Sequence, residues 1–172
     1  NTAVGGLALA ANTTGAENVA VGVNSLDSCT TGTNNVGVGN GTLAATTTAA
    51  NNTALGHNAG IALTSGTVCV LVGSLAGKNL TTGANNVIVG YTAGAHSIGL
   101  TTGTQNTILG NFADTTAVNT DNANILGFDV SGETGYTTLG VGGNDIRASH
   151  GVITWATVSD ERYKKDIVDS TA

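Results

Sequence analysis

The chain contains no proline and no methionine, and it has few aromatic residues (3%) and few charged residues (9%). A globular enzyme core is usually built from large side chains, because each buried aromatic removes a large area from water. Here the apolar residues are mainly alanine, valine, isoleucine and leucine, so any core must be thin. The composition does not predict disorder either, since disordered chains combine low hydrophobicity with high charge and this chain is 40% hydrophobic.

Basic residues are also scarce: five lysines and arginines against eleven acidic residues give a net charge of −6. Nucleic acids and anionic membrane surfaces are bound by clustered lysine and arginine, so the sequence predicts neither partner. No apolar run approaches the length of a transmembrane helix, and no basic and then apolar signal peptide opens the chain. The first residue is Asn1 rather than methionine, which suggests a piece of a longer protein.

What the chain has in abundance is a five-residue unit that recurs every 17 residues. The unit is a polar residue, three mostly apolar residues and a glycine, and the glycine is present in all eight copies. One step, between Asn86 and Asn106, is 20 residues long. The copies begin at Asn1, Asn18, Asn35, Asn52, Cys69, Asn86, Asn106 and Ala123. A fixed period of this kind is the signature of a solenoid.

Each unit predicts a short strand followed by a turn. The glycine ends the strand where the backbone must bend or approach a neighbour closely. A small residue such as Ala59 or Ala76 follows three places on, and a Thr-Thr-Gly turn such as residues 81–83 leads back. The three extra residues of the long step are expected in a bulged loop between His96 and Leu100. The sequence therefore predicts an all-β fold, a parallel β-solenoid or β-roll of 17-residue repeats.

Stacking the units at the inter-strand spacing of about 4.8 Å places equivalent residues above one another. Asn1, Asn18 and Asn35 would form an amide ladder, as stacked asparagines do in cross-β structures. Eight rungs would give a rod of about 35–40 Å.

Alternation along each strand predicts which way the side chains face. Positions two and four of the unit should point one way, into the solenoid core, and position three should point outward. Position three is nevertheless apolar and becomes bulkier along the chain, from Ala3 to Leu71 and Ile125. Strands that are apolar on both faces are usually buried on both. We therefore expect an obligate oligomer, with the column from Leu71 to Ile125 on its axis.

Chemistry-bearing residues are few and dispersed. His57, His96 and His150 fall in different repeats without a serine or carboxylate partner, so surface or turn positions are the better interpretation. Residues 73–79 resemble a phosphate loop that is one residue short and lacks its final Ser or Thr. Residues 140–143 predict a tight turn. No aspartate column of a calcium-binding repeat exists, and the sequence predicts no cofactor, no metal and no catalysis on an external substrate.

The two cysteines are expected to be unpaired. Cys29 falls in the turn of the second unit and Cys69 in the strand of the fifth. Three rungs would separate them by about 14 Å, well beyond the ~7 Å Cα limit for a disulfide. Cys69 takes a place in the asparagine ladder and is expected to be a small buried residue there.

The Asn-Thr-Ala-Val-Gly unit with its Thr-Thr-Gly turn resembles the left-handed β-roll heads of trimeric autotransporter adhesins. It is also similar to the stalks of phage tail fibres built from this repeat. The resemblance covers about residues 1–127 and implies a homotrimer.

The Ser-Asp-Glu-Arg-Tyr-Lys run at residues 159–164 resembles the start of the intramolecular-chaperone domain of many phage tailspikes and fibres, which reads Ser-Asp-x-Arg-x-Lys. The resemblance implies a chaperone that assembles the trimer and then cuts itself off at the Ser159–Asp160 bond. Ser159 would be the nucleophile and Lys164 its activating partner. The chain stops at Ala172, so it would hold only the beginning of that domain. Seven of the sixteen charged residues lie at positions 160–172, which also fits a plain solvated tail.

Together these patterns predict three segments: a β-roll shaft over residues 1–130, a β-rich neck or cap over 131–158, and the chaperone start over 159–172. The favoured function is a trimeric shaft of a virion tail fibre or tailspike for host attachment, located on the virion surface. The alternative is the head or stalk of a bacterial trimeric adhesin on the cell surface. An ice-binding solenoid would need two outward threonine columns, and the pattern predicts one at best. A host cell-surface receptor, if this segment touches one, would meet the His96 loop or the tip around Asp145.

Overall fold

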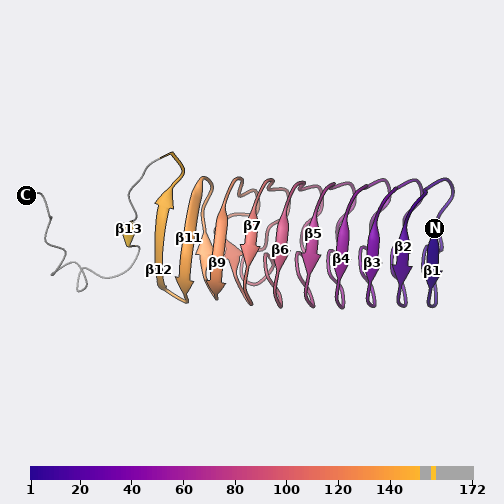
Figure 1. The fold of residues 1–172 in the computed structure, drawn as a ribbon, viewed down its shortest axis with the longest axis horizontal. Helices are drawn as coiled ribbons and strands as arrows, with labels where there is room; N and C mark the ends of the chain where they lie inside the picture. Colours follow the sequence, from indigo (N-terminus) through magenta and orange to yellow (C-terminus); the bar gives the residue numbers. More distant parts are fainter. Residues whose placement is uncertain (152–155, 158–172) are drawn as a thin grey trace, which may run out of the picture.

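The structure, a computed structural model, describes residues 1–151 and 156–157, which form a long rod of stacked strands (Figure 1). Eleven strands belong to one sheet that runs the length of the rod, and two more form a small second sheet. Within these residues the chain has no helix, and so none of a length and apolarity that could cross a membrane. The prediction of an all-β parallel solenoid is confirmed.

The repeat strands pair in parallel, and each residue meets its equivalent in the next rung. Thr2 pairs with Val19, for example, and Val19 with Val36, which is the 17-residue step. The long step is also accommodated in register, because Val87 pairs with Thr107. The rung strands are β1 (Thr2–Val4), β2 (Val19–Val21), β3 (Val36–Val38), β4 (Thr53–Leu55), β5 (Val70–Val72), β6 (Val87–Val89), β7 (Thr107–Leu109) and β9 (Asn124–Phe128).

Beyond β9 the strand pairing changes from parallel to antiparallel. β11 (Tyr136–Val141) still pairs in parallel with β9, but β12 (Asn144–Ser149) and β13 (Ala156–Thr157) add to the sheet in antiparallel fashion. A tight turn through Gly142, at a φ of 59°, joins β11 to β12, as the glycine run predicted. The small sheet pairs β8 (Asp114–Thr115) with β10 (Ser131–Gly132). The predicted β-rich region at this end is therefore present.

The predicted orientation of the strands was wrong. Position three of the unit is the interior column, with Ala20, Leu71 and Ile108 all at 0% exposure. Positions two and four point outward, and their most exposed large side chains are 37% to 58% accessible: Val4, Leu55, Val70, Val87 and Leu126. The column from Leu71 to Ile125 is therefore the core of one chain and cannot lie on the axis of an oligomer. We call the outward columns of positions two and four the aliphatic face.

The reason lies in a second interior column, four residues after the unit's glycine. Where position three is small, as at Gly37, this column holds a leucine, Leu43, that fills the interior. Where position three is Leu71 or Ile88, the column holds Gly77 or Gly94. The fourth rung combines the small Ala54 with Gly60, because Leu71 of the next rung takes up the space there. A Cβ added at Gly60 would lie 2.5 Å from Leu71 Cδ1, and one at Gly94 would lie 3.1 Å from Ile88 Cδ1. A large side chain in one column is thus accompanied by a small one in the other, because a close-packed interior leaves no room for two large side chains.

The asparagine ladder is buried beside this core, as expected. Asn35 Oδ1 accepts from the backbone N–H and the amide of Asn52, both at 3.1 Å. The Asn35 amide donates to Asn18 Oδ1 at 3.1 Å and to the Ala49 carbonyl at 2.8 Å. Each asparagine therefore joins its own rung to both neighbours and closes the turn, which satisfies polar groups that would otherwise be orphaned in a thin interior.

The glycine that ends each strand is required by close approach. At Gly56 and Gly73 φ is 128° and 129°, a region that side chains rarely adopt. A Cβ at Gly73 would lie 2.5 Å from the Gly90 carbonyl oxygen of the next rung. The rungs stack backbone on backbone at this corner.

Candidate functional site

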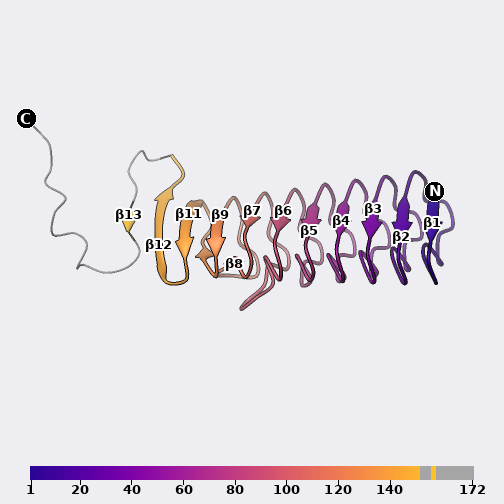
Figure 2. The same ribbon diagram turned by 60° about the horizontal axis from the view of Figure 1, so that its bottom comes forward.

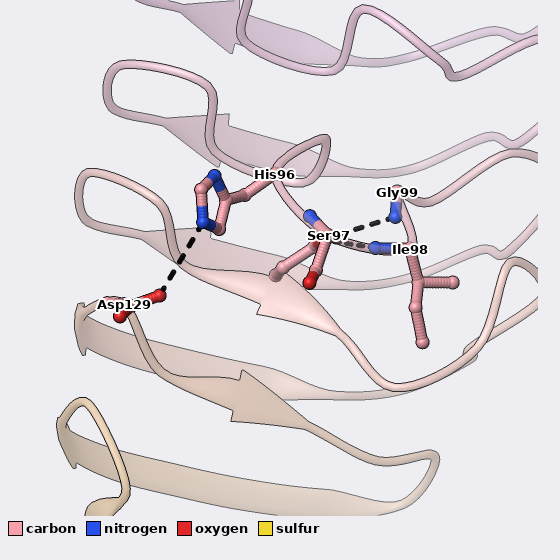
Figure 3. Close-up of polar contacts among 6 residues, drawn as sticks. His96, Ser97, Ile98, Gly99 and Asp129 are labelled. Carbon is pink, nitrogen blue, oxygen red and sulfur yellow. Dashed lines mark hydrogen bonds and ion pairs between the residues drawn. The ribbon is translucent and has the colours of Figure 1, made fainter.

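The three extra residues of the long step form a loop that projects from the rod after β6, where the bulge was predicted (Figure 2). The Asp114 carboxylate of the next rung holds it. Asp114 Oδ2 accepts from the backbone N–H groups of Ser97, Ile98 and Gly99 at 2.7, 3.1 and 3.2 Å (Figure 3). Three backbone N–H groups on one side-chain oxygen tie the loop to the next rung.

Asp114 is itself buried, at 1% exposure, in the column where the preceding rungs place glycine. Its other oxygen, Oδ1, has no hydrogen-bond partner within the described part of the chain. Sequence reasoning identified the loop but not this anchor. The signal was available as an aspartate at the position of Gly60, Gly77 and Gly94.

Beside the loop, three aromatic side chains from successive rungs form what we call the aromatic cluster. The ring of Phe112 lies edge-on to the rings of Tyr91 and Phe128, with centroids 5.3 and 5.7 Å apart. Tyr91 is 47% exposed and Phe128 is 51% exposed. Sequence reasoning missed the cluster, although its members occupy the first or second position after the unit's glycine in consecutive rungs.

His96, at the start of the loop, closes one side of the cluster. Its ring lies tilted against Phe112, with centroids 4.6 Å apart. Its Nε2 lies 3.8 Å from Asp129 Oδ1, and both side chains are about half exposed (Figure 3). No carboxylate partner was predicted for His96, because Asp129 follows two rungs later and comes into range only through the stacking of the rungs.

The other histidines lie on the surface, as predicted. His57 is exposed without a described partner, and His150 Nε2 lies 3.2 Å from Thr137 Oγ1 and 3.4 Å from Asn124 Nδ2. Among residues 1–151 and 156–157, no group of three histidine, cysteine, aspartate or glutamate side chains is placed to hold a metal ion.

Both cysteines are free and buried, as expected. Burial raises the pKa of both thiols above the ordinary value, which makes the thiolate form less accessible. Cys69 Sγ lies 3.5 Å from the Gly83 carbonyl, the place of an asparagine amide in other rungs. Neither thiol has the character of a nucleophile.

The threonine turns present one column that is exposed along the whole rod, as expected, and a neighbouring column in which Thr30, Thr64, Thr81 and Thr101 are half-buried. The column from Thr14 to Thr102 is exposed throughout. In the neighbouring column the hydroxyls from Thr13 to Thr81 donate to a carbonyl of the next rung, as from Thr13 to Thr30 at 3.0 Å and from Thr64 to Thr81 at 3.1 Å. One of the two rows thus has its hydroxyl protons engaged within the rod.

At the tip, Arg147 Nη1 contacts Glu133 Oε1 at 2.6 Å, and its guanidinium lies 5.4 Å from the centroid of the Tyr136 ring. Burial raises the pKa of the neighbouring Asp145 carboxyl, although Arg147 partly opposes this. Ser159, Lys164 and the Ser159–Asp160 bond lie outside the described residues, and their roles stay predictions.

Comparison with known proteins returned nothing: no family model, no curated protein and no solved structure matches the chain. The function must therefore be argued from the rod and its surfaces.

Proposed function

We propose that this chain is a shaft segment of a trimeric fibre, of the kind found in virion tail fibres and tailspikes, that holds a host-binding part away from the particle. The observation that carries the proposal is the aliphatic face. It runs along all eight rungs and contains no charged residue.

Position four of the unit is Val or Leu on all eight rungs, and a monomeric soluble protein rarely exposes so long an apolar column. On the aliphatic face Val4, Leu55 and Leu126 are each about half exposed, although they lie on the first, fourth and eighth rungs. Burial of such a surface is favourable by about 25 cal/mol for each Å² removed from water. A sister chain is the natural cover, because a rod of constant pitch can match its own repeat along the whole length.

The choice of a virion fibre over a bacterial adhesin rests on the run at residues 159–164 alone. Its resemblance to a chaperone start supports a chain that assembles with the help of a C-terminal domain and then releases it through Ser159 and Lys164. The sequence of the gene beyond Ala172 tests this choice. A complete chaperone domain supports the fibre, and a membrane-anchoring domain would support the adhesin.

The oligomer is tested by a charge on the aliphatic face. Sedimentation velocity should show a trimer for the unmodified chain and a folded monomer for Leu55→Glu, with the β-type circular dichroism spectrum retained. Thr82→Glu, in an exposed turn, is the matched control and should stay trimeric. Ile108→Asp should instead abolish folding, because Ile108 lies inside a single chain. A monomeric unmodified chain would refute the trimer.

A further inference from the structure

We propose that the aromatic cluster of Tyr91, Phe112 and Phe128, with His96 and Asp129 at its edge, binds a neutral saccharide chain. This inference goes beyond the shaft function and does not depend on it, since it concerns the outer corner of one chain. It would make this part of the rod a binding segment as well as a spacer.

The distribution of aromatic residues is the first argument. The chain has only six phenylalanine, tyrosine and tryptophan residues, and three of them meet at this one place. Tyr91 and Phe128 do not fill the core, because about half of each side chain is open to water. Exposed apolar patches rimmed by polar groups mark interaction sites on otherwise polar surfaces.

The cluster lies next to the aliphatic face, at the corner that follows the unit's glycine. Tyr91 and Phe128 belong to the column directly after the unit's glycine, and other rungs fill that column with exposed Asn40, His57 and Asn111. Because Asn40, His57 and Asn111 are polar and exposed, this column faces solvent on their rungs. Tyr91 and Phe128 are therefore local replacements on the rungs of β6 and β9, and Phe112, one position further along on the rung of β7, lies between them.

The chemistry of the edge favours a sugar as the occupant. One face of a pyranose ring presents C–H groups that stack on aromatic rings, while its hydroxyls seek hydrogen bonds at the rim. The His96 imidazole, the Asp129 carboxylate and the Tyr91 hydroxyl offer both donors and acceptors there. The carboxylate and the net charge of −6 disfavour an acidic saccharide.

The direction of the cluster fits an extended chain. Its three rings come from successive rungs, which are spaced by about 4.8 Å along the rod. That spacing is close to the length that one hexose adds to an extended polysaccharide. A saccharide lying along the rod axis would thus place successive sugars over successive rungs.

The loop is held ready for such a ligand. Three N–H groups of the loop bind the buried Asp114 carboxylate, so His96 is positioned without any ligand present (Figure 3). A site that is already ordered loses less conformational entropy on binding. Asp114 acts here as a positioning residue and does not itself reach the surface.

Saturation-transfer NMR on the whole chain tests the proposal, because it detects weak binding. The probes are β-linked hexasaccharides of glucose and of N-acetylglucosamine, with oligogalacturonate as the acidic comparator. We expect transfer to at least one neutral probe, little to oligogalacturonate, and a loss of at least about tenfold in Phe128→Ala and Tyr91→Ala. Val23→Ala is the matched control, because Val23 is 50% exposed in the same column four rungs from Tyr91.

The inference would be overturned by no transfer to either neutral probe, or by equal transfer with Phe128→Ala. If Phe128→Ala instead changed only the oligomeric state by sedimentation, the cluster would be a contact between copies and the saccharide site would be refuted. If the unmodified chain were monomeric but bound the sugar, the proposed trimer would be refuted and the saccharide site would still stand.

Discussion

Replacement of Asn35 by alanine removes one rung of the amide ladder, and the cost can be worked out from its four hydrogen bonds. The Asn52 N–H and the Ala49 carbonyl both bond to the Asn35 side chain, at 3.1 and 2.8 Å. No other backbone or side-chain partner for either group occurs within the described residues. Two buried polar groups are thus left unsatisfied, while Asn18 Oδ1 keeps its bond from the Asn35 backbone at 2.9 Å.

Each orphaned buried group costs about 1–3 kcal/mol, so Asn35→Ala should lower the free energy of unfolding by about 2–6 kcal/mol. Urea denaturation followed by circular dichroism at one fixed protein concentration measures this loss. Asn40→Ala is the control, because Asn40 is exposed and its change should stay within about 0.5 kcal/mol. Equal midpoints for the two variants would show that the ladder does not stabilise the rod.

Three further substitutions test other features of the rod. Cys69→Asn restores the ladder at its one cysteine, offers a carbonyl acceptor to Asn86, and should raise the free energy of unfolding by about 1–2 kcal/mol in the same urea assay. Val68→Asn should raise the free energy of unfolding by about 1 kcal/mol, because the φ of 58° at Val68 strains a β-branched residue but is tolerated by asparagine. An unchanged urea midpoint would argue against that strain. Asp145→Asn should stabilise the chain at neutral pH. Because the pKa of Asp145 is raised in the folded state, its charged form opposes folding as pH rises. The stabilisation by Asp145→Asn, measured by thermal unfolding, should therefore shrink below about pH 4, where the carboxyl is protonated in both states. A stabilisation that did not depend on pH would contradict this explanation.

The period of the sequence was enough to predict the rungs and their register, because glycine and asparagine recur at fixed positions and stack like on like. It could not predict the facing of the strands. Alternation distinguishes two faces only when one is polar, and here both are aliphatic. The deciding signal was a pairing of sizes: the small Gly37 occurs with the large Leu43, and the large Leu71 occurs with the small Gly77. This pairing shows that the two columns share one interior.

The candidate site was predictable only in part. The extra residues marked the loop at His96, but its partners Asp114 and Asp129 lie on later rungs. Their contacts depend on how the rungs stack and not on any local pattern. The aromatic cluster has the same origin, since Tyr91 and Phe128 are 37 residues apart in the chain.

The corner where Gly56, Gly73 and Gly90 stack also bears on how such a protein can change length. A residue inserted there would separate two backbones in van der Waals contact, whereas the loop at His96 shows that the turn admits extra residues. Genetic exchange between two of the 17-residue repeats removes or adds a whole number of units and keeps the strand register. Fibres of this design can therefore lengthen or shorten in increments of about 4.8 Å without a new folding problem at each step.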